Sequence, residues 1–197
     1  MLQWYKWHII CLKLEKNYLL KGGGVMLKSF MLALLTCVSI GSIAYAEDCV
    51  SFSNRNAEVS KINGRWKIVD GNHWLFDFAG KRDEAYQALR VIKYYRMNQS
   101  CFVGRPNPSF TYMLISSRAP AGSYRGEDCI GFNNANLSVV RAGRRNTWKL
   151  VDGSHWIVDF DYKKAEAYQA LKIVKKHKFS QVCYVGRPGP SFTYWKR

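Results

Sequence analysis

Two short polar segments that each end in His-Trp contain the side chains best suited to hold a ligand. Residues 70–74 read Asp-Gly-Asn-His-Trp, and residues 152–156 read Asp-Gly-Ser-His-Trp. A sugar ring can stack on an indole face while carboxylate, amide and imidazole groups bind its hydroxyls. The candidate binding side chains are therefore His73, Trp74, His155 and Trp156. The favoured interpretation is nevertheless structural: an Asp-Gly turn followed by a tryptophan in the core. Strand alternation places Trp74 on the same face as Phe76 and Phe78.

His73 and Asp77, repeated as His155 and Asp159, are four residues apart and would lie on the same face of a strand. The strand rise separates such side chains by roughly 13 Å. This separation excludes a direct hydrogen bond or a shared metal ion between them if the strand is regular. We expect His73 to cap the hairpin turn or to hydrogen-bond Asp70, and contact with a ligand is the alternative.

Two arginines precede a proline in the Gly-Arg-Pro segments at residues 104–106 and 186–188. An extended Arg105 or Arg187 is suited to bind a carboxylate or phosphate through two guanidinium nitrogens. The favoured interpretation is an internal partner, such as Asp48 or Asp77, and an anionic ligand is the alternative. The Pro-x-Pro-Ser segment that follows each arginine is stiff enough to act as a wedge in a protein contact.

The chain is strongly basic, with 30 Lys and Arg against 14 Asp and Glu and a net charge of +16. Residues 1–46 contain five lysines and one glutamate, so the remainder keeps about +12. Basic residues concentrate in residues 141–145 and in a second predicted helix, where Lys172, Lys175 and Lys176 are binding candidates. A charge run is usually a solvated face. The alternative is a patch for lipopolysaccharide, teichoic acid or, less favoured, nucleic acid.

The sequence contains no recognised catalytic pattern. It lacks Gly-x-Ser-x-Gly, His-Glu-x-x-His, P-loop and dinucleotide-binding patterns, and no Ser-His-Asp order is present. We therefore predict a non-catalytic protein with no catalytic residue, no cofactor and no metal ligand.

From residue 47 onward the chain is one segment written twice. Three long stretches recur: residues 68–78 as 150–160, 84–93 as 166–175, and 101–112 as 183–194. The period is 80 residues before Trp66 and 82 after it, so the second copy has a two-residue insertion between Cys129 and Trp148. We expect this insertion in a hairpin turn.

We define repeat 1 as residues 47–114 and repeat 2 as residues 127–197, with a predicted linker at residues 115–126 that is rich in Ser, Ala and Gly. Each repeat is predicted to be an α+β module, a mainly antiparallel sheet with one helix on one face, in the order β-β-β-α-β-β. In repeat 1 the predicted elements are a strand at 49–52, a hairpin of 65–69 and 73–78, a helix at 83–97, and strands at 100–104 and 109–114.

Alternation along the hairpin predicts one wall of the core, formed by Trp66, Ile68, Trp74, Phe76 and Phe78. Helical spacing predicts the stripe that covers this wall, formed by Ala85, Ala88, Leu89, Ile92 and Tyr95.

Four cysteines follow residue 46, one matched pair in each repeat: Cys49, Cys101, Cys129 and Cys183. Three pairings are conceivable. The duplication favours Cys49–Cys101 and Cys129–Cys183, because an ancestral single repeat would have closed its own bond. A loop of about 53 residues then gives roughly 4 kcal/mol of constraint on the unfolded chain. The absence of a Cys-x-x-Cys pattern argues against a metal site.

Residues 26–46 have the features of a Sec-type signal peptide: Lys28, an apolar run at 30–43, and Ala-x-Ala before Glu47. We predict cleavage after Ala46 and a secreted or periplasmic protein with no stable membrane span. A retained anchor helix and a lipoprotein modified at Cys37 are less favoured. Residues 1–25 are interpreted as an over-called start, because Lys-Gly-Gly before Met26 is what a translated ribosome-binding sequence would give.

These features favour a secreted or periplasmic binding protein with two equivalent modules, for cell-envelope glycan or another anionic polymer. Two sites in one chain would raise avidity for a repetitive surface. The alternative is a secreted inhibitor or host-directed effector that acts on a protein partner, and an enzyme is the third hypothesis.

Overall fold

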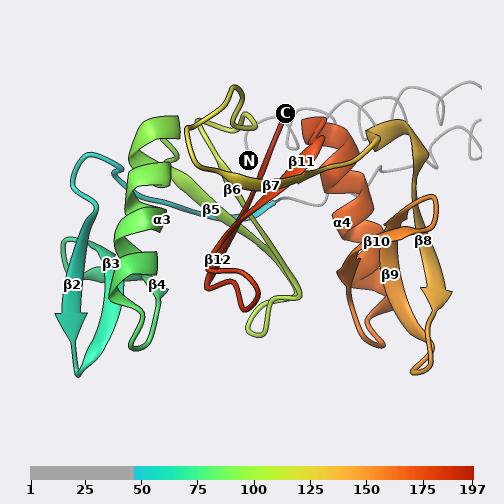
Figure 1. Cartoon of the computed structure of the whole chain (residues 1–197), viewed down its shortest axis with the longest axis horizontal. Helices are drawn as coiled ribbons and strands as arrows, with labels where there is room; N and C mark the ends of the chain where they lie inside the picture. Colours follow the sequence, from blue (N-terminus) through green and yellow to red (C-terminus); the bar gives the residue numbers. More distant parts are fainter. Residues whose placement is uncertain (1–46) are drawn as a thin grey trace, which may run out of the picture. The chain divides into compact units, whose positions relative to one another are not determined.

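Repeat 1 contains six strands and one helix, and repeat 2 follows the same order (Figure 1). The computed structural model describes residues 47–197. The elements of repeat 1 are β1 (Asp48–Ser51), β2 (Glu58–Ile62), β3 (Arg65–Asp70), β4 (His73–Asp77), α3 (Arg82–Tyr95), β5 (Gln99–Val103) and β6 (Phe110–Leu114). Those of repeat 2 are β7 (Asp128–Gly131), a 3₁₀ turn (Asn134–Asn136), β8 (Leu137–Ala142), β9 (Thr147–Asp152), β10 (His155–Asp159), α4 (Lys164–His177), β11 (Gln181–Val185) and β12 (Phe192–Lys196).

The predicted over-called start and signal peptide lie outside the described residues. Neither helix within residues 47–197 is long and apolar enough to cross a membrane.

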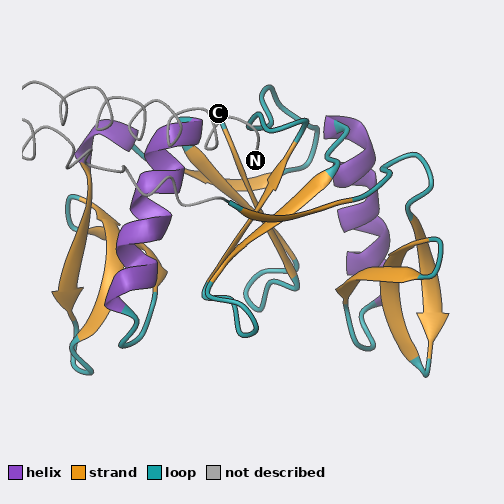
Figure 2. Ribbon diagram, turned by 180° about the vertical axis from the view of Figure 1, so that it is seen from behind, coloured by secondary structure: helices purple, strands orange, loops and turns teal. Residues whose placement is uncertain are grey.

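Each repeat forms two three-stranded antiparallel sheets. Their strand orders are β2-β3-β4 and β1-β5-β6 in repeat 1, and β8-β9-β10 and β7-β11-β12 in repeat 2. We call β2-β3-β4 and β8-β9-β10 the hairpin sheets. Each helix lies along the hairpin sheet of its own repeat (Figure 2). The α+β class with mainly antiparallel sheets is therefore confirmed.

The predicted order within a repeat lacked one strand. Four strands precede the helix, not three, because β2 and β8 were not predicted. β2 reads Glu-Val-Ser-Lys-Ile and lies at a sheet edge with most of its residues exposed, so it has little apolar alternation to reveal it. The two-residue insertion does lie in a hairpin turn. Residues 63–64 join β2 to β3, whereas residues 143–146 join β8 to β9.

Helix α3 begins with Asp83 and Glu84 in its first turn and has Lys93 in its last turn, an order that complements the helix dipole. It ends at Tyr95 and is capped by Arg96, which adopts a left-handed conformation and donates its backbone N–H to the carbonyls of Ile92 and Lys93. Of the predicted stripe, Ala85, Ala88, Ile92 and Tyr95 are buried and Leu89 is partly buried. The alanines allow close approach to β2 and β3.

The predicted position of Trp74 in the core is wrong. Ile68 pairs with Phe76 but Val69 pairs with Trp74, so Leu75 is an extra residue that forms a β-bulge in β4. A bulge reverses the alternation beyond it, which turns Trp74 to the outer face of the sheet. Ile157 forms the same bulge in β10 before Val158. The rest of the predicted wall packs inward, with Ile68 and Phe78 buried and Trp66 and Phe76 partly buried.

Both predicted disulfides are present. Cys49–Cys101 joins directly paired residues of β1 and β5, and Cys129–Cys183 joins the equivalent residues of β7 and β11. Each bond stays within its own repeat.

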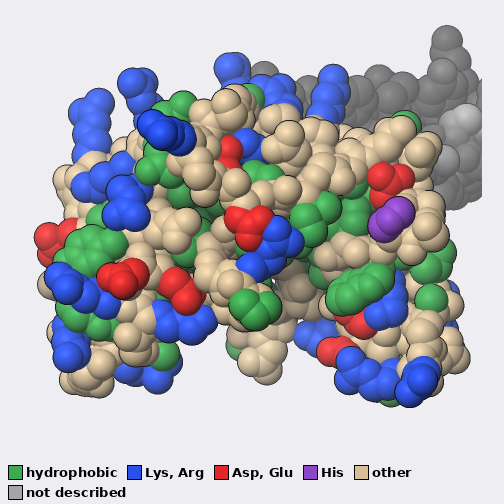
Figure 3. Space-filling model, viewed as in Figure 1, with side chains coloured by type: hydrophobic (Ala, Val, Ile, Leu, Met, Phe, Trp, Pro, Cys, Tyr) green, Lys and Arg blue, Asp and Glu red, His purple; other side chains and the backbone are tan. Residues whose placement is uncertain are grey.

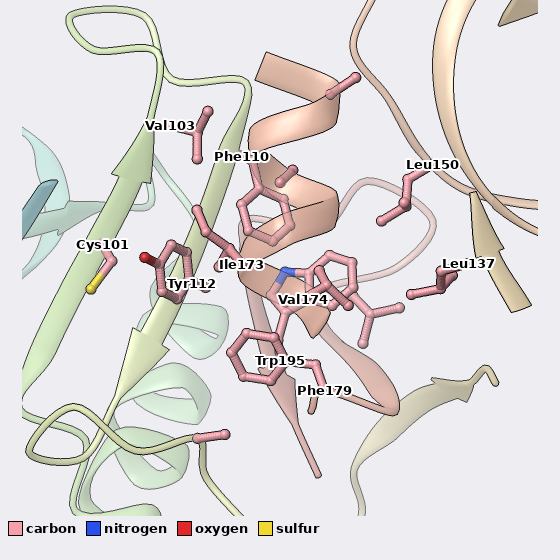
Figure 4. Packing of buried hydrophobic residues seen from close by; sticks show 14 of the residues in the cluster. Cys101, Val103, Phe110, Tyr112, Leu137, Leu150, Ile173, Val174, Phe179 and Trp195 are labelled. Carbon is pink, nitrogen blue, oxygen red and sulfur yellow. The ribbon is translucent and has the colours of Figure 1, made fainter. Parts of the chain in front are cut away.

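The two repeats share their apolar interior. One core cluster combines residues of β5 and β6 with α4 and the hairpin sheet of repeat 2. In Figure 4, Phe110 and Tyr112 of β6 lie beside Ile173 of α4 and Trp195 of β12, and the ring centroids of Phe110 and Trp195 are 5.0 Å apart. The second cluster has the reciprocal composition, with α3 packed against residues of β11 and β12 such as Phe192. Each helix is therefore covered by the sheet that carries the disulfide of the other repeat: α3 by β7-β11-β12, and α4 by β1-β5-β6.

The predicted linker is packed against the same structure. Ala119 is buried, and the backbone of Pro120 accepts a hydrogen bond of 2.9 Å from the Arg197 N–H. The Lys196 ammonium donates to the Gly122 carbonyl at 2.9 Å. This segment is a fixed connection in the structure.

Candidate functional site

Two tryptophans at equivalent positions are the most exposed indoles of the described residues. Trp74 is 61% exposed and Trp156 is 65% exposed. Burying an indole normally stabilises a fold, so solvent exposure at both copies needs another explanation. Both rings reach the outer face because the same bulge is present in β4 and in β10.

Around Trp74 the strand register assembles a cation and a carboxylate. Lys67 and Asp77 are directly paired across β3 and β4. The Lys67 ammonium lies 4.7 Å from the Trp74 ring centroid and 3.7 Å from an Asp77 oxygen. Arg65 binds the same carboxylate, with its Nε 2.9 Å from Oδ2. The Trp74 site is thus an open aromatic ring beside a held ion pair.

Trp156 has the same surroundings in repeat 2. The Lys149 ammonium lies 4.8 Å from the Trp156 ring centroid and forms an ion pair with Asp159. Thr147 takes the place of Arg65 and donates a 2.9 Å hydrogen bond from its hydroxyl to Asp159. Hence the ring, the lysine and the carboxylate occur in both repeats, and only the third partner differs.

Both carboxylates are held in their ionised form. The hydrogen bond from Arg65, followed by that from the Ala79 N–H, lowers the pKa of Asp77. Burial opposes ionisation of Asp159, but hydrogen bonds from Lys149, the Asp161 N–H and Thr147 lower its pKa overall. An ionised carboxylate can accept hydrogen bonds from ligand hydroxyls, and it has no proton to donate as a general acid.

The histidines of the Trp sites are exposed, and the expected bond between His73 and Asp70 is not formed. Asp70 instead accepts a 2.7 Å hydrogen bond from the Ser53 N–H, and Asp152 accepts one from the Asn133 N–H. Within residues 47–197 the imidazoles of His73 and His155 have no side-chain hydrogen-bond partner, and both residues are exposed to solvent.

The two arginines have the internal partner that was favoured. Arg105 forms a two-point ion pair with Asp48, and Arg187 does the same with Asp128. The arginine hydrogen bonds lower the pKa of each aspartate. Asp77, the other suggested partner, binds Arg65. These arginines therefore hold the start of each repeat, and their charge is paired internally.

The candidate lysines of α4 do not form one site with the tryptophans. Lys172, Lys175 and Lys176 are exposed on the helix, and the Lys176 ammonium lies 3.1 Å from Glu47. Basic side chains are also spread over much of the face seen in Figure 3, with acidic side chains among them. The charge is thus broadly distributed.

Two other features, a group of possible metal ligands and a surface depression, do not form a ligand site that is present in both repeats. Glu127, Cys129 and Cys183 lie close together, but the sulfurs are joined in a disulfide and offer no thiolate. A shallow depression is lined by Asn54, Arg55, Lys93 and Arg96, and its counterpart in repeat 2 has Ala135 in place of Arg55.

The alternation argument missed Lys67 and Lys149 as partners of the tryptophans. A sequence signal was present, because Lys, Trp and Asp are identical at these positions in both copies, whereas a core position, Ile68 in repeat 1, is Leu150 in repeat 2. No family model, no curated protein and no solved structure matches this chain.

Proposed function

We propose that the protein is an exported, non-catalytic binding protein that holds cell-envelope glycan at Trp74 and Trp156. The single observation that carries this proposal is the duplicated exposure of the two indoles, each beside a lysine and an ionised aspartate. Export is supported by two intra-repeat disulfides, which are typical of oxidising compartments, and by the signal-like residues 26–46.

The chemistry of the two faces suits a sugar. A pyranose ring covers an indole face, and its hydroxyls reach the carboxylate and ammonium groups beside it. Covering roughly 100 Å² of apolar ring surface stabilises a complex by about 2.5 kcal/mol, which is a weak single contact. Weak contacts suit a polymer, because two sites on one chain raise the effective concentration of the second contact.

Binding without catalysis agrees with the state of the carboxylates. Asp77 and Asp159 are both paired with cations, and neither has a neighbouring carboxyl held protonated to serve as the acid of glycoside hydrolysis.

The alternative of a protein-directed inhibitor that uses the Gly-Arg-Pro-x-Pro-Ser loops is less favoured. The Ser109 hydroxyl donates to Glu166 and the Ser191 hydroxyl donates to Glu84, so part of each loop already binds the other repeat.

An isothermal calorimetric titration of residues 47–197 with the N-acetylglucosamine hexamer tests the glycan proposal, because its signal does not depend on the substituted tryptophans. We expect saturable binding that is weakened in Trp74→Ala and in Trp156→Ala and is lost in the double variant. Tyr162→Ala is a matched control, because Tyr162 is 70% exposed but its counterpart in repeat 1 is Gly80. An unchanged affinity in the double variant would reject the Trp sites.

A further inference from the structure

A second pair of aromatic clusters lies on the opposite face of the hairpin strands from the Trp sites. Trp66 precedes Lys67 in β3, so their side chains point to opposite faces. Lys61 and Arg82 lie over the Trp66 ring, at 5.7 Å and 5.5 Å from its centroid. The Tyr86 ring lies 6.3 Å from the Trp66 ring, and Arg82 lies 5.4 Å from the Tyr86 centroid. We call this set the Trp66 cluster.

Repeat 2 builds the same cluster with its cations exchanged. Arg141 and Lys164 lie 6.0 Å and 5.1 Å from the Trp148 centroid, and the Tyr168 ring lies 6.2 Å away. The position of Lys61 is taken by arginine, and that of Arg82 by lysine. The tryptophan and the tyrosine are identical in the two repeats. The two cations have changed type but kept their positive charge, which indicates that the charge itself matters. We call this set the Trp148 cluster.

These cations lack the carboxylate partners that the lysines of the Trp sites have. Lys67, Lys149, Arg105 and Arg187 are all paired with carboxylates. Across residues 47–197, no carboxylate lies within ion-pair distance of the four cluster cations, Lys61, Arg82, Arg141 and Lys164, and Arg141 donates only to the Asn146 carbonyl. An aromatic ring holds a cation in place without neutralising it. Each cluster thus presents two positioned, uncompensated positive charges.

We infer that the Trp66 and Trp148 clusters are a second pair of binding sites, which recognise anionic groups (phosphate, sulfate or carboxylate) of the polymer. Two cations without a carboxylate partner lie near each of these indoles. At Trp74 and Trp156, by contrast, the single lysine near the ring is paired with an aspartate. The inference rests on the proposed function in assigning both kinds of site to one ligand. It specifies the ligand as an anionic glycan.

The test compares the N-acetylglucosamine hexamer with its O-sulfated derivative, so that only the anionic groups differ. The variant Lys61→Gln, Arg82→Gln, Arg141→Gln, Lys164→Gln removes the four cluster cations. We expect about a tenfold or greater loss of affinity for the sulfated hexamer, unchanged affinity for the neutral hexamer, and a weaker salt dependence.

Two further variants separate a site from general charge attraction. A control with Arg90, Lys93, Lys175 and Lys178 changed to Gln loses the same charge from exposed positions on the helices and just beyond α4, and we expect it to retain most of its affinity. Exchanging Lys and Arg at the four cluster positions keeps the charge and should restore binding. Equal losses in the cluster and control variants, or no loss in the cluster variant, would overturn the inference.

Failure of the proposed function would look different. In that case the neutral hexamer would not bind, or the Trp74→Ala, Trp156→Ala variant would bind it normally, whatever the cluster variants do.

Discussion

Glu84, in the first turn of α3, accepts a hydrogen bond from the Ser191 hydroxyl of the other repeat, and Glu166 of α4 accepts the equivalent bond from Ser109. Two of the three stretches that recur between the repeats, the one that begins at Glu84 and the one that contains Ser109, contribute to this pair of hydrogen bonds. Each repeat supplies the helix that receives the loop of the other, so both segments must match in both copies.

We predict that Gly186→Ala destabilises the fold more than Gly64→Ala. Both glycines have a positive φ, +87° and +77°, which is costly for any side chain. A Cβ at Gly186 would overlap the Glu84 carboxylate, whereas a Cβ at Gly64 would have no heavy atom within 4 Å. Glu84 must then lose its hydrogen bond with Ser191, which adds about 1 kcal/mol to the destabilisation. Urea denaturation measures the difference, and adding Glu84→Ala should abolish it. Equal effects at the two glycines would contradict the contact.

We predict that the two repeats stay together after the chain between them is cut. A protease recognition sequence is inserted at the exposed residues 121–123 and cleaved after folding. Both disulfides are within repeats, so non-reducing denaturing gels should show two fragments, while size-exclusion chromatography of the native protein should show one species. Separation of the fragments under native conditions would contradict a shared core.

We predict that Lys196→Met costs about 3–5 kcal/mol, because it leaves the buried Glu127 without its cation. The side chains of Lys196 and Glu127 are 3% and 7% exposed, and their charged atoms are 2.6 Å apart. Adding Glu127→Gln removes the orphaned charge, so the double variant should be more stable than Lys196→Met alone. A double-mutant cycle followed by chemical denaturation measures this coupling. Additive effects would show that the pair is not coupled.

We predict a loss of stability on acidification that depends on Glu127. Burial opposes its ionisation, but hydrogen bonds from Lys196, the Tyr124 N–H and two tyrosines lower its pKa below the ordinary 4.5. A lowered folded-state pKa gives stability that is complete above about pH 4.5 and declines as the pH falls toward the folded pKa. The free energy of unfolding should therefore depend less on pH in that window in Glu127→Gln than in the wild type. An unchanged pH dependence in Glu127→Gln would contradict the prediction.

Features that depend on residue type and on the duplication could be predicted from the sequence, whereas the strand bulge and the packing between the repeats could not. The disulfide pairs and the inserted turn follow from residue types and from the duplication, whereas the helix predicted to reach residue 97 ends at Tyr95. The outward turn of Trp74 could not be predicted by alternation, because the bulge at Leu75 has no residue signal such as glycine. The shared core was equally hidden, because the apolar face of β6 would fit its own helix or the helix of the other repeat.

The central claim is that Trp74 and Trp156 form equivalent glycan-binding faces, and co-sedimentation with insoluble cell-wall glycan tests it most directly. Residues 47–197, the two single Trp→Ala variants, the double variant and Tyr162→Ala are compared at low and high salt. We predict wild-type retention in Tyr162→Ala, partial loss in each single variant, and loss of retention in the double variant at high salt, where attraction to the cluster cations is screened. Full retention of the double variant at high salt would contradict the claim.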